Sequence, residues 1–114
     1  MTFAEEIEQT VGPEPIEALV LEPWGEEIWG LHAQDERLKA SREIGGKVVS
    51  WEQARPFLDY EYDSGFGGQD CHSVTIWTPT RVIFVHEYDG ATGLTWVPRH
   101  PVEHCPAANG LGGL

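Results

Sequence analysis

Hydrophobic and polar residues alternate most clearly in the second half of the chain, where three β-rich runs cover residues 74–78, 82–88 and 94–97. A short Pro-containing connection follows the first run. Asp89-Gly90, a dipeptide typical of tight hairpin turns, follows the second. The middle run has apolar residues on both faces, so it is expected to lie centrally and to be covered at least partly on both sides. The pattern predicts a three-stranded antiparallel meander.

The first half of the chain predicts shorter elements. A helix is expected over residues 3–9, because Thr2 and Glu5 have the spacing of a capping box at its start. The apolar stretch 16–21 predicts a strand. A Pro-Trp-Gly turn follows it, and residues 26–32 predict a partner strand.

The middle of the chain is less regular. Residues 34–43 are polar and fit either a solvated loop or a weak helix, whereas residues 47–49 predict a short strand. Ser50 and Gln53 repeat the capping-box pattern at the start of a second helix. Pro56 is expected to shorten or kink that helix.

Together these elements predict an α+β fold, with an antiparallel sheet, the C-terminal meander and one or two short helices. A chain of 114 residues has the length of one domain. We place this domain at residues 1–105 and expect the uncharged segment 106–114 to be a loosely ordered tail. Trp51, Trp77 and Trp96 are expected to pack in the core.

The chain has a large excess of acidic residues. Nineteen Asp and Glu oppose seven Lys and Arg, so the formal net charge is −12. Ten of the acidic residues, and no basic residue, lie in residues 1–36, whereas residues 71–114 sum to only −1. Phosphates are bound by clustered Lys and Arg, so the charge argues against binding to nucleic acid or to an anionic membrane. No apolar run has the length of a membrane helix and the start is acidic, which predicts a cytoplasmic protein.

The acidic first third predicts a partner-binding site. An exposed tryptophan among carboxylates suits a basic protein, because Trp supplies contact area and the carboxylates supply long-range attraction. The candidates are five glutamates and one tryptophan: Glu14, Glu17, Glu22, Trp24, Glu26 and Glu27. The alternative interpretation is a surface that serves only solubility, with Trp24 and Trp29 closing the core.

Four carboxylates follow part of a calcium-loop spacing: Asp59, Glu61, Asp63 and Asp70. The glycine of the sharp turn comes one residue late, and Asp70 stands where a bidentate glutamate is required. Alternation along an extended strand gives a simpler explanation, with Tyr60 and Tyr62 inward and the carboxylates in water. We therefore predict no calcium site.

Cys71 and Cys105 flank the meander, which places them towards opposite ends of the sheet. This arrangement weakens both a disulfide and a zinc site shared with His100 and His104. Two reduced thiols, one disulfide and a metal-bound pair all remain open, and we predict no metal ligands and no cofactor.

Sequence motifs for catalysis are absent. The chain has no Gly-x-Ser-x-Gly, no phosphate-binding glycine loop and no His-Glu-x-x-His. His86 and Glu87 are neighbours on one strand and point to opposite faces. We predict no catalytic residue. The alternative is a small enzyme in which the fold brings His72, His86 or His100 near a carboxylate.

Residues 46–101 contain five distinctive short segments: Asp59-Tyr-Glu-Tyr-Asp, Gly67-Gly-Gln-Asp-Cys-His, Thr80-Arg-Val-Ile-Phe-Val, Glu87-Tyr-Asp-Gly-Ala-Thr and Trp96-Val-Pro-Arg. In these segments the chain resembles small proteins of actinobacteria and their phages. The resemblance implies no activity. It implies a setting in the host cytoplasm and a phage accessory role.

These observations predict a non-enzymatic, acidic protein-interaction module. Its most specific form is an inhibitor whose carboxylates imitate the charge of nucleic acid and occupy the binding surface of a basic, nucleic-acid-binding protein. A small metal-stabilised module built on the Cys and His residues, and a small enzyme, are the alternatives. The oligomeric state is left open.

Overall fold

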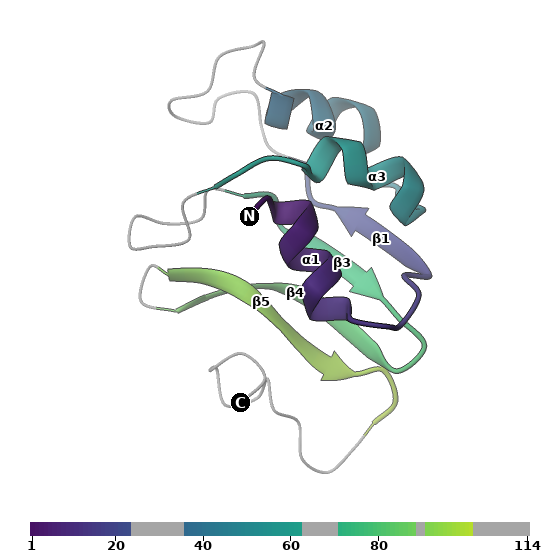
Figure 1. Cartoon of the computed structure of the whole chain (residues 1–114). Coiled ribbons are helices and arrows are strands. Elements are labelled where there is room, and N and C mark those ends of the chain that lie inside the picture. Colours follow the sequence, from purple (N-terminus) through teal and green to yellow (C-terminus); the bar gives the residue numbers. More distant parts are fainter. Residues whose placement is uncertain (24–35, 63–70, 89–90, 102–114) are drawn as a thin grey trace.

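The computed structural model describes residues 1–23, 36–62, 71–88 and 91–101, in which one five-stranded antiparallel sheet forms a layer of the fold (Figure 1). The strand order is β2-β1-β3-β4-β5. The strands are β1 (Ala18–Leu21), β2 (Val48–Val49), β3 (Val74–Trp77), β4 (Arg81–Tyr88) and β5 (Ala91–Pro98). Strands β3 to β5 are the expected meander, so the α+β prediction is confirmed.

Three helices, α1 (Phe3–Val11), α2 (Glu36–Ile44) and α3 (Trp51–Leu58), form the second layer in the described residues. Both predicted capping boxes are present. The side chain of Thr2 accepts from the backbone of Glu5 at the start of α1, and Ser50 does the same with Gln53 at the start of α3. Pro56 lies in the last turn of α3, where its nitrogen cannot donate the usual helical hydrogen bond, and the helix ends two residues later.

The sequence left residues 34–43 as either a loop or a weak helix, and in the structure most of this segment forms the helix α2. Ala40 and Ile44 are its buried core residues. Its Glu, Arg, Lys, Leu and Ala residues favour a helix, and packing against the core adds to that preference. The predicted strand at 26–32 and the tail at 106–114 lie outside the described residues. Strand β1 has β3 on one side and β2 on the other. In the pair with β2, Leu19 lies opposite Val49 and Val20 lies opposite Val48.

The register assigns the two faces of the sheet. Leu19, Ile76, Ile83 and Trp96 lie directly opposite one another on successive strands, and this row joins the core under the helices. Strand β4 lies between β3 and β5 as expected, although the middle strand of the five is β3. The alternate row, which includes Phe84, lies on the face away from the helices.

One tryptophan is not where the sequence pattern placed it. Trp51 and Trp96 pack against the core, as expected. Trp77 pairs with Val82 in the row that faces away from the helices, and it is half-buried there. The reason is the period of two along β3: Ile76 takes the core position, so its neighbour must point to the other face.

The start of α1 is fixed against the segment that follows α3. The backbone N–H of Phe3 donates to the carbonyl of Tyr60 at 2.7 Å. The Phe3 ring is fully buried and lies against Tyr60 and Tyr62 at centroid distances of 5.9 and 5.3 Å. Tyr60 and Tyr62 thus point inward and Asp59 and Glu61 are exposed, as the alternation predicted.

Candidate functional site

The predicted partner-binding residues fall into two groups in the structure. Glu14, Glu17 and Glu22 lie before and after β1, in described parts of the chain. Trp24, Glu26 and Glu27 lie outside the described residues. The environment of the first three decides how much of their charge faces a partner.

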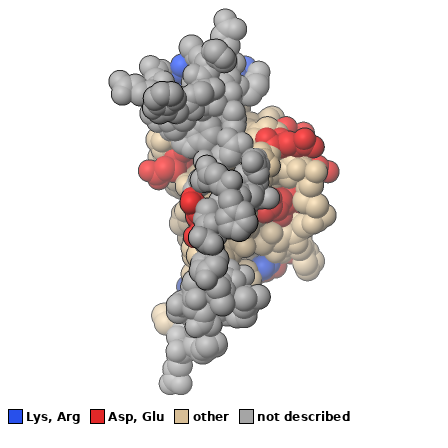
Figure 2. All heavy atoms as spheres, turned by 90° about the vertical axis from the view of Figure 1, so that its left-hand side faces the viewer, with Lys and Arg blue, Asp and Glu red and all other residues tan. Residues whose placement is uncertain are grey.

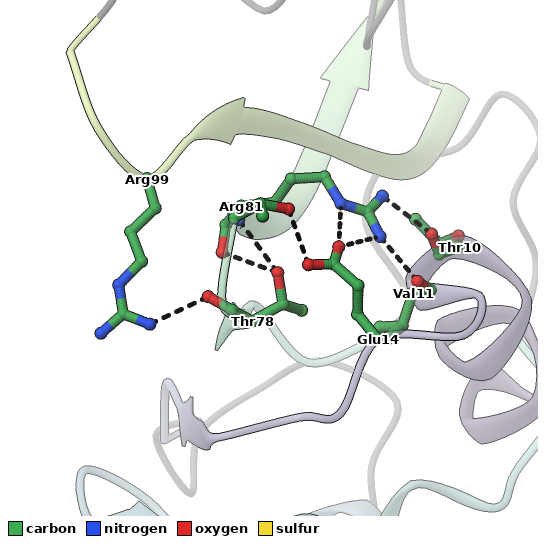
Figure 3. A network of polar contacts seen from close by, with 7 residues as sticks. Thr10, Val11, Glu14, Thr78, Arg81 and Arg99 are labelled. Atoms are coloured by element: carbon green, nitrogen blue, oxygen red, sulfur yellow. Dashed lines mark hydrogen bonds and ion pairs between the residues drawn. The ribbon is translucent and has the colours of Figure 1, made fainter.

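Glu14 is held by an arginine from β4 (Figure 3). Arg81 Nε donates to Glu14 Oε1 at 2.8 Å, and the hydroxyl of Thr80 donates to Glu14 Oε2 at 2.6 Å. The hydrogen bond from Thr80, followed by the guanidinium of Arg81, lowers the pKa of Glu14 below its ordinary value of 4.5. This carboxylate therefore stabilises the fold above its unfolded pKa, and the contribution is lost as the pH falls through the lower folded pKa.

The same guanidinium closes the end of α1. Arg81 donates to the carbonyl oxygens of Thr10 at 3.1 Å and Val11 at 2.6 Å, two of the acceptors that a helix C-terminus leaves without an intrahelical partner (Figure 3). It also lies 5.5 Å from the centroid of the Trp96 ring, within the range of a cation–π contact. Arg81 therefore joins α1, the segment before β1 and the sheet.

Glu17 has a comparable partner at the same end of the sheet, because Pro98, which precedes Arg99, lies opposite Arg81. Arg99, which follows β5, forms an ion pair with Glu17. It also donates to the carbonyl of Thr78 at 3.0 Å (Figure 3). Glu22 differs from both, because its side chain is exposed and forms no ion pair with an arginine or lysine of the described residues. Of the three described candidates, Glu22 has the charge most available to a partner.

A further acidic group surrounds Arg55 on α3. Arg55 donates to both carboxylate oxygens of Glu8 at 3.2 and 3.1 Å and lies 3.7 Å from Asp59. These contacts lower the pKa of Glu8, mainly through the hydrogen bond from Arg55, and raise that of Arg55. Glu5 adds a third negative charge near the guanidinium. Figure 2 shows acidic side chains of the described residues at several places on the face it presents.

A buried polar cluster lies between α2 and the start of β3. His72 is fully buried, and its Nδ1 lies 2.7 Å from the hydroxyl of Tyr60 while its Nε2 lies 3.3 Å from Ser41 Oγ. The backbone N–H of His72 donates to the same Tyr60 hydroxyl at 2.9 Å. In either neutral tautomer one ring nitrogen donates and the other accepts, so both contacts are satisfied.

Ser41 and His72 are close enough to act as a nucleophile and a base, but their surroundings do not suit this chemistry. A Ser–His contact is the core of many acyl-transfer sites. Here a phenol occupies the position at Nδ1 where a carboxylate would stabilise an imidazolium, and Ser41 is itself only 7% exposed. The geometry is that of a packing element which ties α2 and the segment after α3 to the sheet.

Neither the motifs nor the spacing of the sequence identified this cluster or Arg81. Among the described residues, no group of three or more His, Cys, Asp or Glu is arranged to hold a metal ion. Cys71 is fully buried, and His104 and Cys105 lie outside the described residues. No helix in the described part of the chain is long and apolar enough to cross a membrane.

Removing Arg81 should therefore destabilise the fold more than removing a surface arginine. We expect Arg81→Met to lower the free energy of unfolding by about 2 kcal/mol, because two helix carbonyls lose their donor. Arg55→Met removes an arginine whose side chain is 39% exposed and should have a much smaller effect. Urea titrations followed by tryptophan fluorescence compare the two, and equal losses would contradict the bridging role of Arg81.

Comparisons of the chain with protein-family models, with curated proteins and with solved structures found no match.

Proposed function

We propose that the protein is a non-enzymatic, acidic interaction module that binds a basic partner, and that its most specific form is a phage-type inhibitor that imitates the charge of nucleic acid. The observation that carries the proposal is the uneven distribution of charge. Three arginines are used in pairs with Glu8, Glu14 and Glu17. Each of these pairs is neutral, so the formal net charge of −12 is carried by the other residues of the chain, among which four are basic.

Those four basic residues are close together in the sequence. They lie on α2 and directly before β2: Arg37, Lys39, Arg42 and Lys47. The rest of the surface therefore has a negative potential, which accelerates the approach of a cationic groove and repels nucleic acid. A partner whose Arg and Lys normally meet phosphates fits this surface by charge.

The ion pairs refine the proposed contact. Glu14 and Glu17 hold the fold together, so the contact is proposed to rest on Glu22 with Trp24, Glu26 and Glu27. Trp24 would supply the apolar anchor and the glutamates the attraction. Binding of this kind weakens as salt screens the charges.

The test begins with the immobilised protein and a lysate fraction that has first been retained on a DNA column. We expect a nucleic-acid-binding protein to be retained, to elute at moderate salt and to be displaced by duplex DNA. Retention that is insensitive to both salt and duplex would contradict the imitation of nucleic acid.

Charge-neutralising variants then test the site. We expect the triple variant Glu22→Gln, Glu26→Gln and Glu27→Gln to raise the dissociation constant for the captured protein about tenfold or more. The matched control removes three exposed carboxylates elsewhere, Glu43→Gln, Glu52→Gln and Glu87→Gln, and so changes the net charge equally. A fluorescence anisotropy titration of each variant gives the comparison. If both triple variants lose the same affinity, net charge alone determines binding and the site is wrong.

A further inference from the structure

Strand β5 ends the sheet, and its outer edge is open in the described part of the chain (Figure 1). All eight residues of β5 pair with β4 on one side, from Ala91 opposite Tyr88 to Pro98 opposite Arg81. No described residue pairs with the other side. A row of unpaired N–H and C=O groups of this kind can add a further strand.

The composition of β5 does not oppose such pairing. None of its residues, Ala-Thr-Gly-Leu-Thr-Trp-Val-Pro, is charged, and eight residues span roughly 27 Å of strand. The opposite edge of the sheet shows the usual protection, because β2 has only two residues and follows the exposed Lys47. Proteins commonly place charge or short strands at edges that must stay single, so the difference between the two edges is informative.

The charge distribution indicates which kind of strand could pair with the outer edge of β5. Two copies of a chain with a net charge of −12 repel one another over most of their surfaces. Residues 71–114, which include β5, sum to only −1, so two copies meet with least repulsion along this strand. A basic partner would instead be drawn to the acidic first third of the chain.

We propose that β5 pairs antiparallel with β5 of a second copy, so that two five-stranded sheets continue as one across a two-fold axis. Directly opposite residues of antiparallel strands share a face. If the helices of both copies lie on the same side of the joined sheet, the two-fold axis must pass between one residue and its own counterpart in the other copy. Placing the axis at Leu94 or at Thr95 gives the longest overlap between the two β5 strands. The dimer does not depend on the proposed binding of a basic partner.

Sedimentation equilibrium of the full chain over a range of concentrations tests the assembly. We expect a monomer–dimer equilibrium whose dissociation constant falls as salt is raised, because screening reduces the repulsion between the copies. This salt dependence is opposite in sign to that of the proposed partner binding, so one proposal can fail while the other stands. A monomer at all concentrations, at both low and high salt, would overturn the dimer.

Gly93 provides a variant that the monomer should accept. A Cβ placed there meets no heavy atom within 4 Å. With the axis at Leu94, a lysine introduced at this position in each copy would lie on the same face as its counterpart, about 7–8 Å away. We expect Gly93→Lys to raise the dimer dissociation constant about tenfold or more, whereas Gly93→Ala leaves it nearly unchanged. If net charge alone controlled assembly, the lysine would strengthen the dimer instead.

Amide hydrogen exchange of the unmodified protein locates the contact without any variant. We expect amides of β5 to become more protected as the concentration rises, while those of β1 and β3 do not change. A dimer that protects another part of the chain, or one that Gly93→Lys does not weaken, would overturn the proposed pairing.

Discussion

Replacing Phe3 by alanine is expected to lower the free energy of unfolding by about 4 kcal/mol, the largest loss we anticipate for a single side chain. Phe3 is fully buried and contacts the rings of Tyr60 and Tyr62. Its removal leaves a cavity where α1, the segment after α3 and the sheet meet, and those elements cannot all close around it. A domain of this size has a total stability of only about 5–15 kcal/mol, so the variant should be close to unfolding at ordinary temperatures.

Two further variants show whether the loss comes from the cavity. Phe3→Leu retains most of the volume and should lose clearly less than the alanine variant. Val48→Ala removes a side chain that is 75% exposed and should have almost no effect. Urea denaturation followed by circular dichroism measures all three. A loss below about 1 kcal/mol for Phe3→Ala would mean that the first residues of α1 are not part of the core.

The elements that the sequence predicted are those determined by neighbouring residues. The capping boxes of α1 and α3 each involve side chains three residues apart, and the β4–β5 hairpin follows from Asp-Gly between two β-rich runs. Tyr60 and Tyr62 were placed inward by the period of two. In each case the physical cause lies within one short segment, so the pattern was sufficient.

The ion pairs depend on contacts that no local pattern contains. Arg81 and Glu14 are separated by 67 residues, and Arg99 and Glu17 by 82. Both glutamates were predicted as partner-binding residues because their segment has no basic residue of its own. Folding brings the arginines of the nearly neutral half of the chain to them. Local charge therefore overestimates the charge that a binding partner meets at these two positions.

The cluster around His72 was missed for the same reason. Ser41 is 31 residues from His72, and Tyr60 is 12 residues away, so neither contact produces a motif. The sequence did indicate that Tyr60 points inward. A buried tyrosine requires a partner for its hydroxyl, and a nearby histidine is a suitable one, so the contact between Tyr60 and His72 could be predicted from the sequence.

Tyr60→Phe should have the second-largest effect on stability, with a loss of about 3 kcal/mol. The variant keeps the ring against Phe3 and His72 but removes the hydroxyl that accepts from the His72 backbone N–H and contacts Nδ1. Two polar groups of a fully buried residue lose this partner together, which is why one oxygen atom has so large an effect. Urea denaturation measures the loss, and exchange of the His72 amide should become faster.

Tyr62→Phe is the matched control, because Tyr62 also lies against Phe3 and also loses one hydroxyl. Its hydroxyl donates to Glu6 at 2.6 Å, and burial together with that hydrogen bond raises the pKa of Tyr62. Glu6 is only half-buried, so water can replace the lost donor, and we expect a loss of about 1 kcal/mol. Equal losses in the two variants would show that the hydroxyl of Tyr60 matters no more than a partly exposed hydrogen bond. A larger loss for Tyr60→Phe, with faster exchange at His72, would show that this buried contact secures the segment after α3 to the sheet.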